Sequence, residues 1–184
     1  MNRTDPTGLY ECAPNQDCSA FEDARRRAHE AARNIDNAKQ RRIALAAVDA
    51  YGELGEKNGV TVQMGDLSTS GASLSVRKTD AGLLVTADLS VNDAISLVEG
   101  VAHEGAHILQ FQAGWSVRDT WQSRYNAELP AYYTGFLVRN SLLRQTQSSR
   151  EIGGESHYRA GVGAAISCAN RCRDVPEQFR IRRR

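Results

Sequence analysis

Residues 95–111 place four ionisable side chains inside a largely apolar stretch, and this combination constrains the fold more than any other part of the chain. Apolar residues recur through the stretch at spacings of three and four, which predicts a largely buried helix. Three of the four are His103, Glu104 and His107, in a His-Glu-x-x-His arrangement, and the fourth is Glu99. Unpartnered imidazoles and carboxylates are costly to bury, so the fold must supply a partner for them.

A metal ion would be such a partner. Helix residues four apart lie on the same face, so His103 and His107 can present two imidazoles to one ion. Glu104 lies one residue further round, where its carboxylate can take a proton from water activated by the metal without binding the metal itself. The alternative is a charged helix face that carries two histidines by chance. The spacing favours a zinc hydrolase site with Glu104 as the general base.

The third metal ligand must come from elsewhere, because catalytic zinc usually has three protein ligands and one open position. The extended motif with a third histidine would need Gly at 110 and His at 113, where the chain has Gln110 and Ala113. Asp119 and His157 remain open as ligands. Glu128 is preferred, because it begins a second predicted helix, and the segment after His107 is long enough to let that helix pack antiparallel on the first.

The second helix also carries a family resemblance. Glu128-Leu-Pro-Ala131 is similar to the Glu-x-x-Ala/Asp element of gluzincin metallopeptidases, although Pro130 departs from that pattern. Together with His-Glu-Gly-x-His, it resembles the zincin-type toxin domains at the ends of polymorphic toxins, over about residues 92–135. The resemblance implies that His103, His107 and Glu128 bind Zn²⁺ and that Glu104 is the general base.

A second resemblance lies near the start of the chain. Asp5-Pro-Thr-Gly-Leu9 resembles the signature that closes the core of Rhs (YD-repeat) proteins. It implies self-cleavage between Leu9 and Tyr10 and export inside a larger Rhs shell by a type VI secretion system. Delivery into a target bacterial cell and a cognate immunity protein follow from the same resemblance. The implied domains are residues 1–18, the end of the Rhs core and a linker, and residues 19–184, a zincin-like metallopeptidase.

The remaining patterns predict an α+β fold. Residues 3–18 are rich in turn formers and predict an irregular leader. A helical stretch follows, with Ser19 and Glu22 as a capping box and a break at 34–37. Its second half predicts a core face made of Ile43, Ala46, Ala47, Ala50, Tyr51 and Leu54.

Three short strands at 60–64, 72–77 and 82–88 predict a small, mainly antiparallel sheet. Helices are expected from about 92 to 112, from 125 to 143 and from 158 to 173. Pro130 should lie in the first turn of the second of these helices or at a kink. An exposed strand edge beside the metal helix would suit an extended peptide.

Several other residues are candidates for supporting roles. A metallopeptidase needs a further donor to the developing oxyanion, for which Tyr132, Tyr133, His157 and Tyr158 are candidates. Groups that hold the imidazoles through their other ring nitrogens are expected as well. Asp119 and Glu99 are the candidates for that role, although Glu99 is also compatible with a simple surface charge.

Charge and composition limit the classes of binding partner and the route of export. The net charge of the 184-residue chain is +1, which calls for neither nucleic acid nor an anionic membrane. No apolar run is long enough for a membrane span, and Met1 is not followed by a signal-peptide core, so we expect export by another route.

Four cysteines allow three disulfide connectivities. A bridge from Cys12 or Cys18 to Cys168 or Cys172 is the attractive one, and free thiols are the alternative.

Two other functions fit the sequence. The chain could be a housekeeping zinc hydrolase in which Asp5–Leu9 is an ordinary turn, or a non-catalytic binding module with a structural metal. A polypeptide is the favoured substrate, with a peptidoglycan cross-link as the alternative. The sequence leaves open the compartment of the target cell in which the domain acts.

Overall fold

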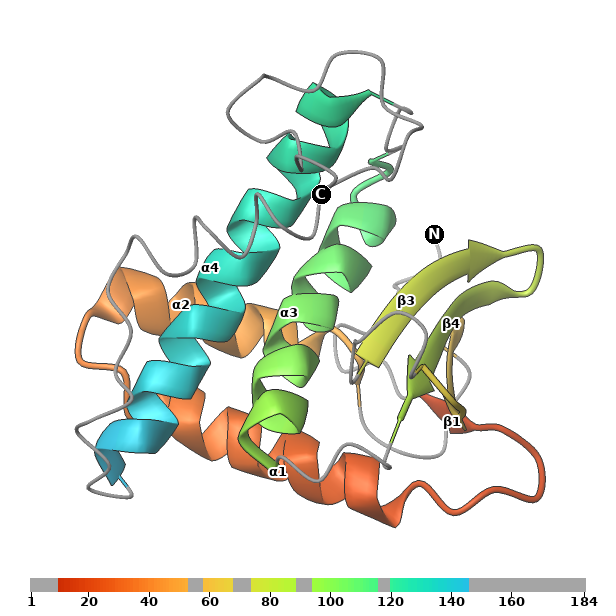
Figure 1. The fold of residues 1–184 in the computed structure, drawn as a ribbon, viewed down its shortest axis with the longest axis horizontal. Coiled ribbons are helices and arrows are strands. Elements are labelled where there is room, and N and C mark those ends of the chain that lie inside the picture. The colour runs from red at the N-terminus through yellow and green to blue at the C-terminus, as the bar shows by residue number, and fades with distance from the viewer. Residues whose placement is uncertain (1–9, 53–57, 68–73, 89–93, 116–119, 146–184) are drawn as a thin grey trace, which may run out of the picture.

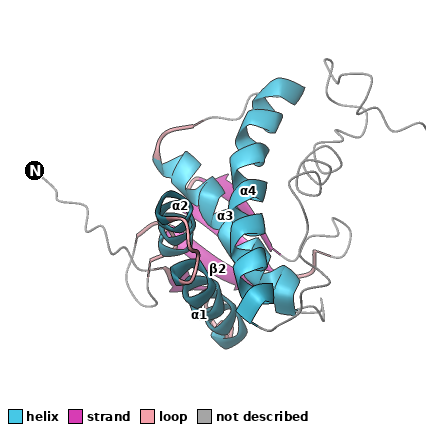
Figure 2. Ribbon diagram, turned by 90° about the vertical axis from the view of Figure 1, so that its left-hand side faces the viewer, coloured by secondary structure: helices cyan, strands magenta, loops and turns pink. Residues whose placement is uncertain are grey.

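A computed structural model describes residues 10–52, 58–67, 74–88, 94–115 and 120–145 of the chain. Within these ranges the fold is α+β, with four helices gathered on one side of a small four-stranded sheet (Figures 1 and 2). The elements in chain order are β1 (Glu11–Cys12), α1 (Ser19–Arg33), α2 (Ala38–Asp49), β2 (Val60–Met64), β3 (Leu74–Thr79), β4 (Gly82–Ala87), α3 (Ala94–Gln112) and α4 (Trp121–Gln145).

The sheet has the strand order β1-β2-β4-β3. Only the β3–β4 hairpin is antiparallel, whereas β2 pairs in parallel with both β1 and β4. The expected mainly antiparallel sheet is therefore wrong, since two of the three pairings are parallel. The physical reason is that β3 lies on the far side of β4, so the chain reverses once between β3 and β4 and returns beside β2 in the direction of β2.

The N-terminal segment belongs to the core from Tyr10 onward. Tyr10 is fully buried, and its ring contacts the ring of Phe21 edge-on at 5.5 Å. β1 then pairs with β2, and the N–H of Ala13 donates to the carbonyl of Val62 at 2.8 Å. The irregular leader predicted as far as residue 18 is wrong for this part, because a buried aromatic anchors it to the sheet.

The cysteines near the start pair with each other, because Cys12 and Cys18 form a disulfide. The expected bridge from these residues to the C-terminal helix is therefore wrong. Both cysteines lie beside β2, because β1 pairs with β2 and Sγ of Cys18 lies 3.8 Å from the carbonyl oxygen of Val62. Cys168 and Cys172 lie outside the described residues, as does the predicted helix at 158–173.

The predicted break between α1 and α2 is confirmed, and the Asn37 side chain caps α2 by accepting from the N–H groups of Lys39 and Gln40. The capping box at the start of α1 is wrong. The N–H of Ser19 donates to the carboxylate of Asp17 at 2.9 Å. Glu22 instead accepts the hydroxyl of Tyr10, because a buried tyrosine hydroxyl needs a partner.

The buried face of α2 is rotated from the predicted one. Ile43 is 38% exposed and Ala46 is also exposed, so both are wrong as core residues, and Leu54 lies outside the described residues. The buried residues of α2 and its C-terminal end are Ala44, Ala47, Val48, Ala50 and Tyr51, so the predictions for Ala47, Ala50 and Tyr51 are confirmed. A contact with α3 explains the rotation: a Cβ added to Gly105 would lie 2.1 Å from the carbonyl oxygen of Ala47. Glycine at this position allows the two helices to touch backbone to backbone.

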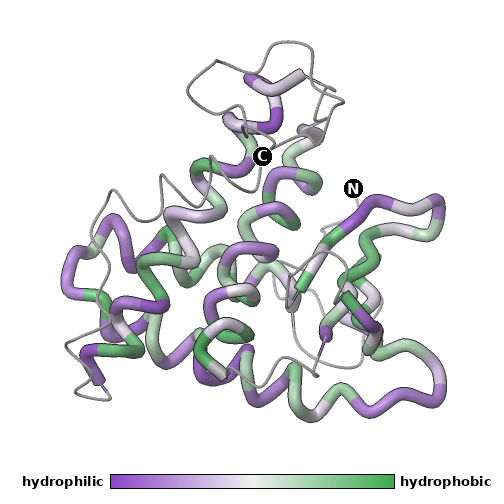
Figure 3. The backbone as a smooth tube through the Cα atoms, in the orientation of Figure 1, coloured by the Kyte–Doolittle hydropathy of each residue, from purple (hydrophilic) through white to green (hydrophobic). Residues whose placement is uncertain are grey.

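Helix α3 lies in the middle of the fold, between α4 and the β3–β4 hairpin (Figure 1). Hydrophobic and hydrophilic residues alternate along it (Figure 3), as a helix with a polar stripe in an apolar setting requires. No helix among the described residues has both the length and the apolar content needed to cross a membrane.

Helix α4 begins at Trp121, earlier than predicted, and Pro130 is its tenth residue rather than part of its first turn. The expectation that Pro130 lies in the first turn is therefore wrong. Proline has no N–H, so the carbonyl of Asn126 lacks its usual helical donor. Asn126 is exposed, which lets water take that place. The helix continues through the proline because both of its ends are held against buried neighbours, with Trp121 and Leu143 in the core.

Candidate metal centre

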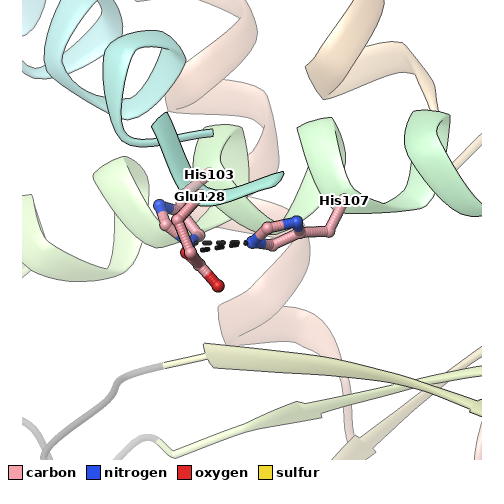
Figure 4. Close-up of side chains that lie close together, drawn as sticks. All are labelled: His103, His107 and Glu128. Atoms are coloured by element: carbon pink, nitrogen blue, oxygen red, sulfur yellow. Dashed lines mark hydrogen bonds and ion pairs between the residues drawn. The ribbon is translucent and has the colours of Figure 1, made fainter. Parts of the chain in front are cut away.

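Helices α3 and α4 bring the three predicted metal ligands together (Figure 4). Nε2 of His103 lies 3.2 Å from Nε2 of His107. Oε2 of Glu128 lies 3.3 Å from each of these nitrogens. The three atoms therefore form an almost equilateral triangle, although Glu128 comes from a different helix.

The size of the triangle fits a small divalent ion. Ligand atoms about 2.0–2.1 Å from a tetrahedral Zn²⁺ are separated from one another by about 3.3–3.4 Å. The observed separations of 3.2 and 3.3 Å agree with this value. Two imidazole nitrogens and one carboxylate oxygen are also a donor set that zinc accepts. Within the described part of the chain, this leaves one tetrahedral position without a protein ligand.

The three groups interact strongly with one another. Burial disfavours the charged form of Glu128, but hydrogen bonds from His103 and His107 outweigh it and lower the pKa of Glu128 to about 2. Burial likewise opposes protonation of His107. The hydrogen bond to Glu128 and the charges of Glu104 and Glu128 prevail and raise the pKa of His107 to about 9. A metal ion would displace the proton from His107, because a metal-bound imidazole must be neutral.

Glu104 lies beside the triangle and spans from it to the sheet. Its Oε1 atom is 3.9 Å from Nε2 of His103, and its Oε2 atom accepts the N–H of Val76 in β3 at 3.0 Å. Burial raises the pKa of Glu104 above its ordinary value, against the opposing charges of His103 and His107. A carboxylate that is harder to deprotonate is also a better proton acceptor near neutral pH, as a general base requires.

Gln110 is a site residue that the sequence argument missed. Its Oε1 atom lies 2.9 Å from Nδ1 of His107, and its Nε2 donates to the carbonyl of Ala127 at 2.8 Å. The available signal was its position three residues after His107, which places both side chains on one face of α3. In the sequence analysis, Gln110 was considered only because it stands where the extended three-histidine motif needs glycine.

The two tyrosine candidates on α4 have different surroundings. The ring of Tyr132 meets the ring of His103 edge-on at 4.4 Å. Burial and the neighbouring carboxylates raise the pKa of Tyr132 to about 12, so its hydroxyl keeps its proton at neutral pH. The hydroxyl of Tyr133 instead accepts from Nε2 of Gln40 in α2 at 2.8 Å. Of the pair, Tyr132 is the one that the structure places next to a predicted ligand.

Some of the remaining candidate site residues lie within the described part of the chain, and the others do not. Glu99 lies 3.8 Å from Nε of Arg139, an ion pair between α3 and α4. Tyr10 is part of the core. Leu9, Asp119, His157 and Tyr158 lie outside the described residues, so their predicted roles stay predictions.

No protein-family model, curated protein or solved structure matches this chain. The resemblances to gluzincins and to Rhs proteins therefore rest on their motif residues alone. The geometry of His103, His107 and Glu128 is an argument independent of them, because the distances follow from how α3 and α4 pack.

One edge of the sheet borders the centre. β3 is the last strand in the order β1-β2-β4-β3, and it packs against α3. Val76 faces Val85 of β4 in the antiparallel register, yet its N–H bonds to Glu104. In an antiparallel ladder, alternate residues direct their N–H and C=O groups away from the partner strand. The outward-facing groups of β3 at Val76 are thus directed toward the side of the metal centre.

Proposed function

We propose that the chain is a zinc-dependent metallopeptidase in which His103, His107 and Glu128 hold Zn²⁺ and Glu104 is the general base. The observation that carries the proposal is the triangle of donor atoms at 3.2 and 3.3 Å with the partly buried Glu104 beside it. When bound, zinc would polarise the substrate carbonyl and lower the pKa of a water molecule to about 7.

The protein groups account for the proton transfers. Glu104 takes the proton of the attacking water and then passes it to the departing amine. Its bond from the N–H of Val76 fixes one carboxylate oxygen and leaves the other turned toward His103. Tyr132, protonated and beside His103, is the candidate donor to the oxyanion that forms on the substrate carbonyl.

A polypeptide is the substrate class that we propose. An extended chain can add to the exposed edge of a sheet through main-chain hydrogen bonds. The position of β3 at the sheet edge beside α3 supports this mode of binding. A peptide cross-link of peptidoglycan contains the same scissile amide and is the alternative substrate.

We further propose that the domain acts as an antibacterial toxin released from an Rhs-type effector. The support is the resemblance of Asp5–Leu9 to the Rhs core signature. A cut after Leu9 would leave all the described elements on one fragment, because these begin at Tyr10. Type VI delivery into a target cell and a cognate immunity protein belong to the same proposal.

Expression in a bacterial host tests both parts. The full chain is produced in the cytoplasm or, behind an added signal peptide, in the periplasm, as wild type, Glu104→Gln and Glu30→Gln. Glu104→Gln removes the base but keeps the size of the side chain, and the zinc content of the purified protein should not change. Glu30→Gln is the matched control, because Glu30 is an exposed residue of α1.

We expect growth arrest with the wild type and with Glu30→Gln, but not with Glu104→Gln. The compartment in which growth stops then contains the substrate. If Glu104→Gln is as toxic as the wild type, the mechanism is wrong. If all variants are harmless while soluble and zinc-loaded, the toxin role fails, and a housekeeping hydrolase or a metal-stabilised binding module takes its place.

A further inference from the structure

We infer that Gln110 is a positioning residue that sets the metal-binding nitrogen of His107 and holds α4 in place beside Glu128. The inference deepens the proposed function, because it rests on the same metal site. It depends on neither the substrate nor the toxin role. Its basis is the pair of bonds that the Gln110 amide makes, to Nδ1 of His107 and to the carbonyl of Ala127.

The orientation of the amide follows from its partner on α4. A backbone carbonyl can only accept a hydrogen bond, so the amide nitrogen of Gln110 must face Ala127. The amide oxygen then faces Nδ1 of His107. Because that oxygen can only accept, Nδ1 must carry a proton. The carbonyl of Ala127, which can only accept, thus fixes the direction of both hydrogen bonds of Gln110.

The two hydrogen bonds of Gln110 also determine which nitrogen of His107 can bind the ion. A neutral imidazole carries one proton, so a proton on Nδ1 leaves Nε2 with a free lone pair. Nε2 is the atom that lies in the triangle, 3.2 Å from His103 and 3.3 Å from Glu128. Gln110 therefore favours the tautomer of His107 that a metal ion needs.

The second bond acts on the other helix. Ala127 directly precedes Glu128, and its carbonyl is held by the side chain of Gln110 on α3. One side chain thus connects a ligand on α3 to the backbone beside a ligand on α4. Removal of a side chain that hydrogen-bonds to a metal ligand commonly lowers metal affinity by about 10–100-fold.

The test compares variants of the full chain by zinc affinity, measured in competition with a chelator. Gln110→Met keeps the length of the side chain and loses both bonds. Gln112→Met is the matched control, because Gln112 lies on the same helix and donates to the carbonyl of Ala50, away from the centre. We expect Gln110→Met to weaken zinc binding by about 10–100-fold. Gln112→Met should stay within about twofold of the wild type.

Gln110→Glu separates positioning of His107 from simple clamping of the helices. A carboxylate still accepts from Nδ1 of His107 but cannot donate to Ala127. Both Gln110 variants should therefore lower the denaturation midpoint of the zinc-free protein, because both lose the bond to Ala127. Gln110→Glu should nevertheless bind zinc clearly more tightly than Gln110→Met, by about tenfold, because carboxylate partners support metal-binding histidines.

Two results would overturn the inference while the metal centre stands: zinc affinity of Gln110→Met within twofold of the wild type, or Gln110→Glu binding as weakly as Gln110→Met. The second result would reduce Gln110 to a clamp between helices. A wild-type chain that binds no zinc would instead overturn the metal centre, and this inference with it.

Discussion

The two faces of α3 use opposite kinds of residue. The face toward α4 carries His103, His107 and Gln110, whose polar atoms meet partners at hydrogen-bonding distance. The face toward α2 carries Gly105, where the absence of a side chain lets the two backbones touch. On the first face the chemical identity of a side chain matters most, and on the second face its size does. Substitutions on the face toward α2 should therefore change stability and leave zinc affinity largely intact.

The largest expected effect is on metal binding and comes from Glu128. Glu128→Gln keeps the shape of the side chain but replaces the charged carboxylate of a proposed ligand by a neutral amide. We expect zinc affinity to fall by more than roughly 100-fold, beyond what the loss of an outer-shell partner costs. Chelator competition measures the loss, and Glu30→Gln is the control for the change in charge. An affinity within tenfold of the wild type would mean that α4 does not supply the third ligand.

The second effect should appear in stability and comes from Gly105. The added methyl group of Gly105→Ala would lie 2.1 Å from the Ala47 oxygen, so α2 and α3 must separate. Overpacking at the upper end of its range, less the gain in helix propensity, predicts a net loss of about 2 kcal/mol. Chemical denaturation without metal measures it.

Gly135→Ala is the comparison for Gly105→Ala. This variant gains the same helix propensity, and its added Cβ would lie 3.1 Å from both Cγ and the backbone oxygen of Glu99, distances that shifts of a few tenths of an ångström relieve. Its change in unfolding free energy should stay below about 1 kcal/mol. Equal losses at the two glycines would show that the contact between α2 and α3 is not the tighter one.

The third effect should be on rate alone and concerns the bond from β3 to Glu104. Val76→Pro removes an N–H that faces away from β4, a position at which edge strands tolerate proline. We expect the purified protein to cleave an unfolded polypeptide about tenfold more slowly, as for a misplaced general base, with unchanged zinc affinity. Lys78→Pro, two residues along the same edge, is the control. A similar loss of rate in both variants would point to damage to the strand rather than to Glu104.

The face of α3 toward α4 was easier to predict from the sequence than the face toward α2. His103, Glu104 and His107 lie within one helical segment, so spacing alone fixes their relative directions. Glu128 required a guess about how α4 returns, and the structure places it with the histidines. Gln110 was missed because a glutamine three residues after a histidine has no distinctive chemistry until Ala127 is known to lie opposite.

The face of α3 toward α2 and the strand order of the sheet were harder to predict, because both depend on contacts between distant segments of the chain. The rotation of α2 follows from a backbone contact at Gly105, which periodicity does not reveal. The parallel pairing of β2 with β4 depends on where β3 lies, and short strands separated by turn residues suggest hairpins throughout. Tyr10 joins the core through Phe21, although its neighbours in sequence are turn formers.

The smallest expected effect tests whether the two faces of α3 are independent. Tyr51 is fully buried below α3, and its hydroxyl donates to the carbonyl of Val101 at 2.9 Å. Tyr51→Phe should lower the unfolding free energy by about 1 kcal/mol, because a buried hydrogen bond is lost. Tyr133→Phe, which loses a partly buried bond to Gln40, is the control and should cost less.

Zinc affinity is the decisive second measurement for Tyr51→Phe. Val101 lies two residues before His103 but on the opposite face of the helix, and as a residue inside α3 it keeps its helical hydrogen bond in the variant. The position of the helix, and with it the triangle of donor atoms, should not change. Unchanged zinc affinity with reduced stability would support the separation of the two faces. If zinc affinity falls along with stability, Tyr51 positions the metal ligands through the backbone of α3, and packing and chemistry on this helix are coupled.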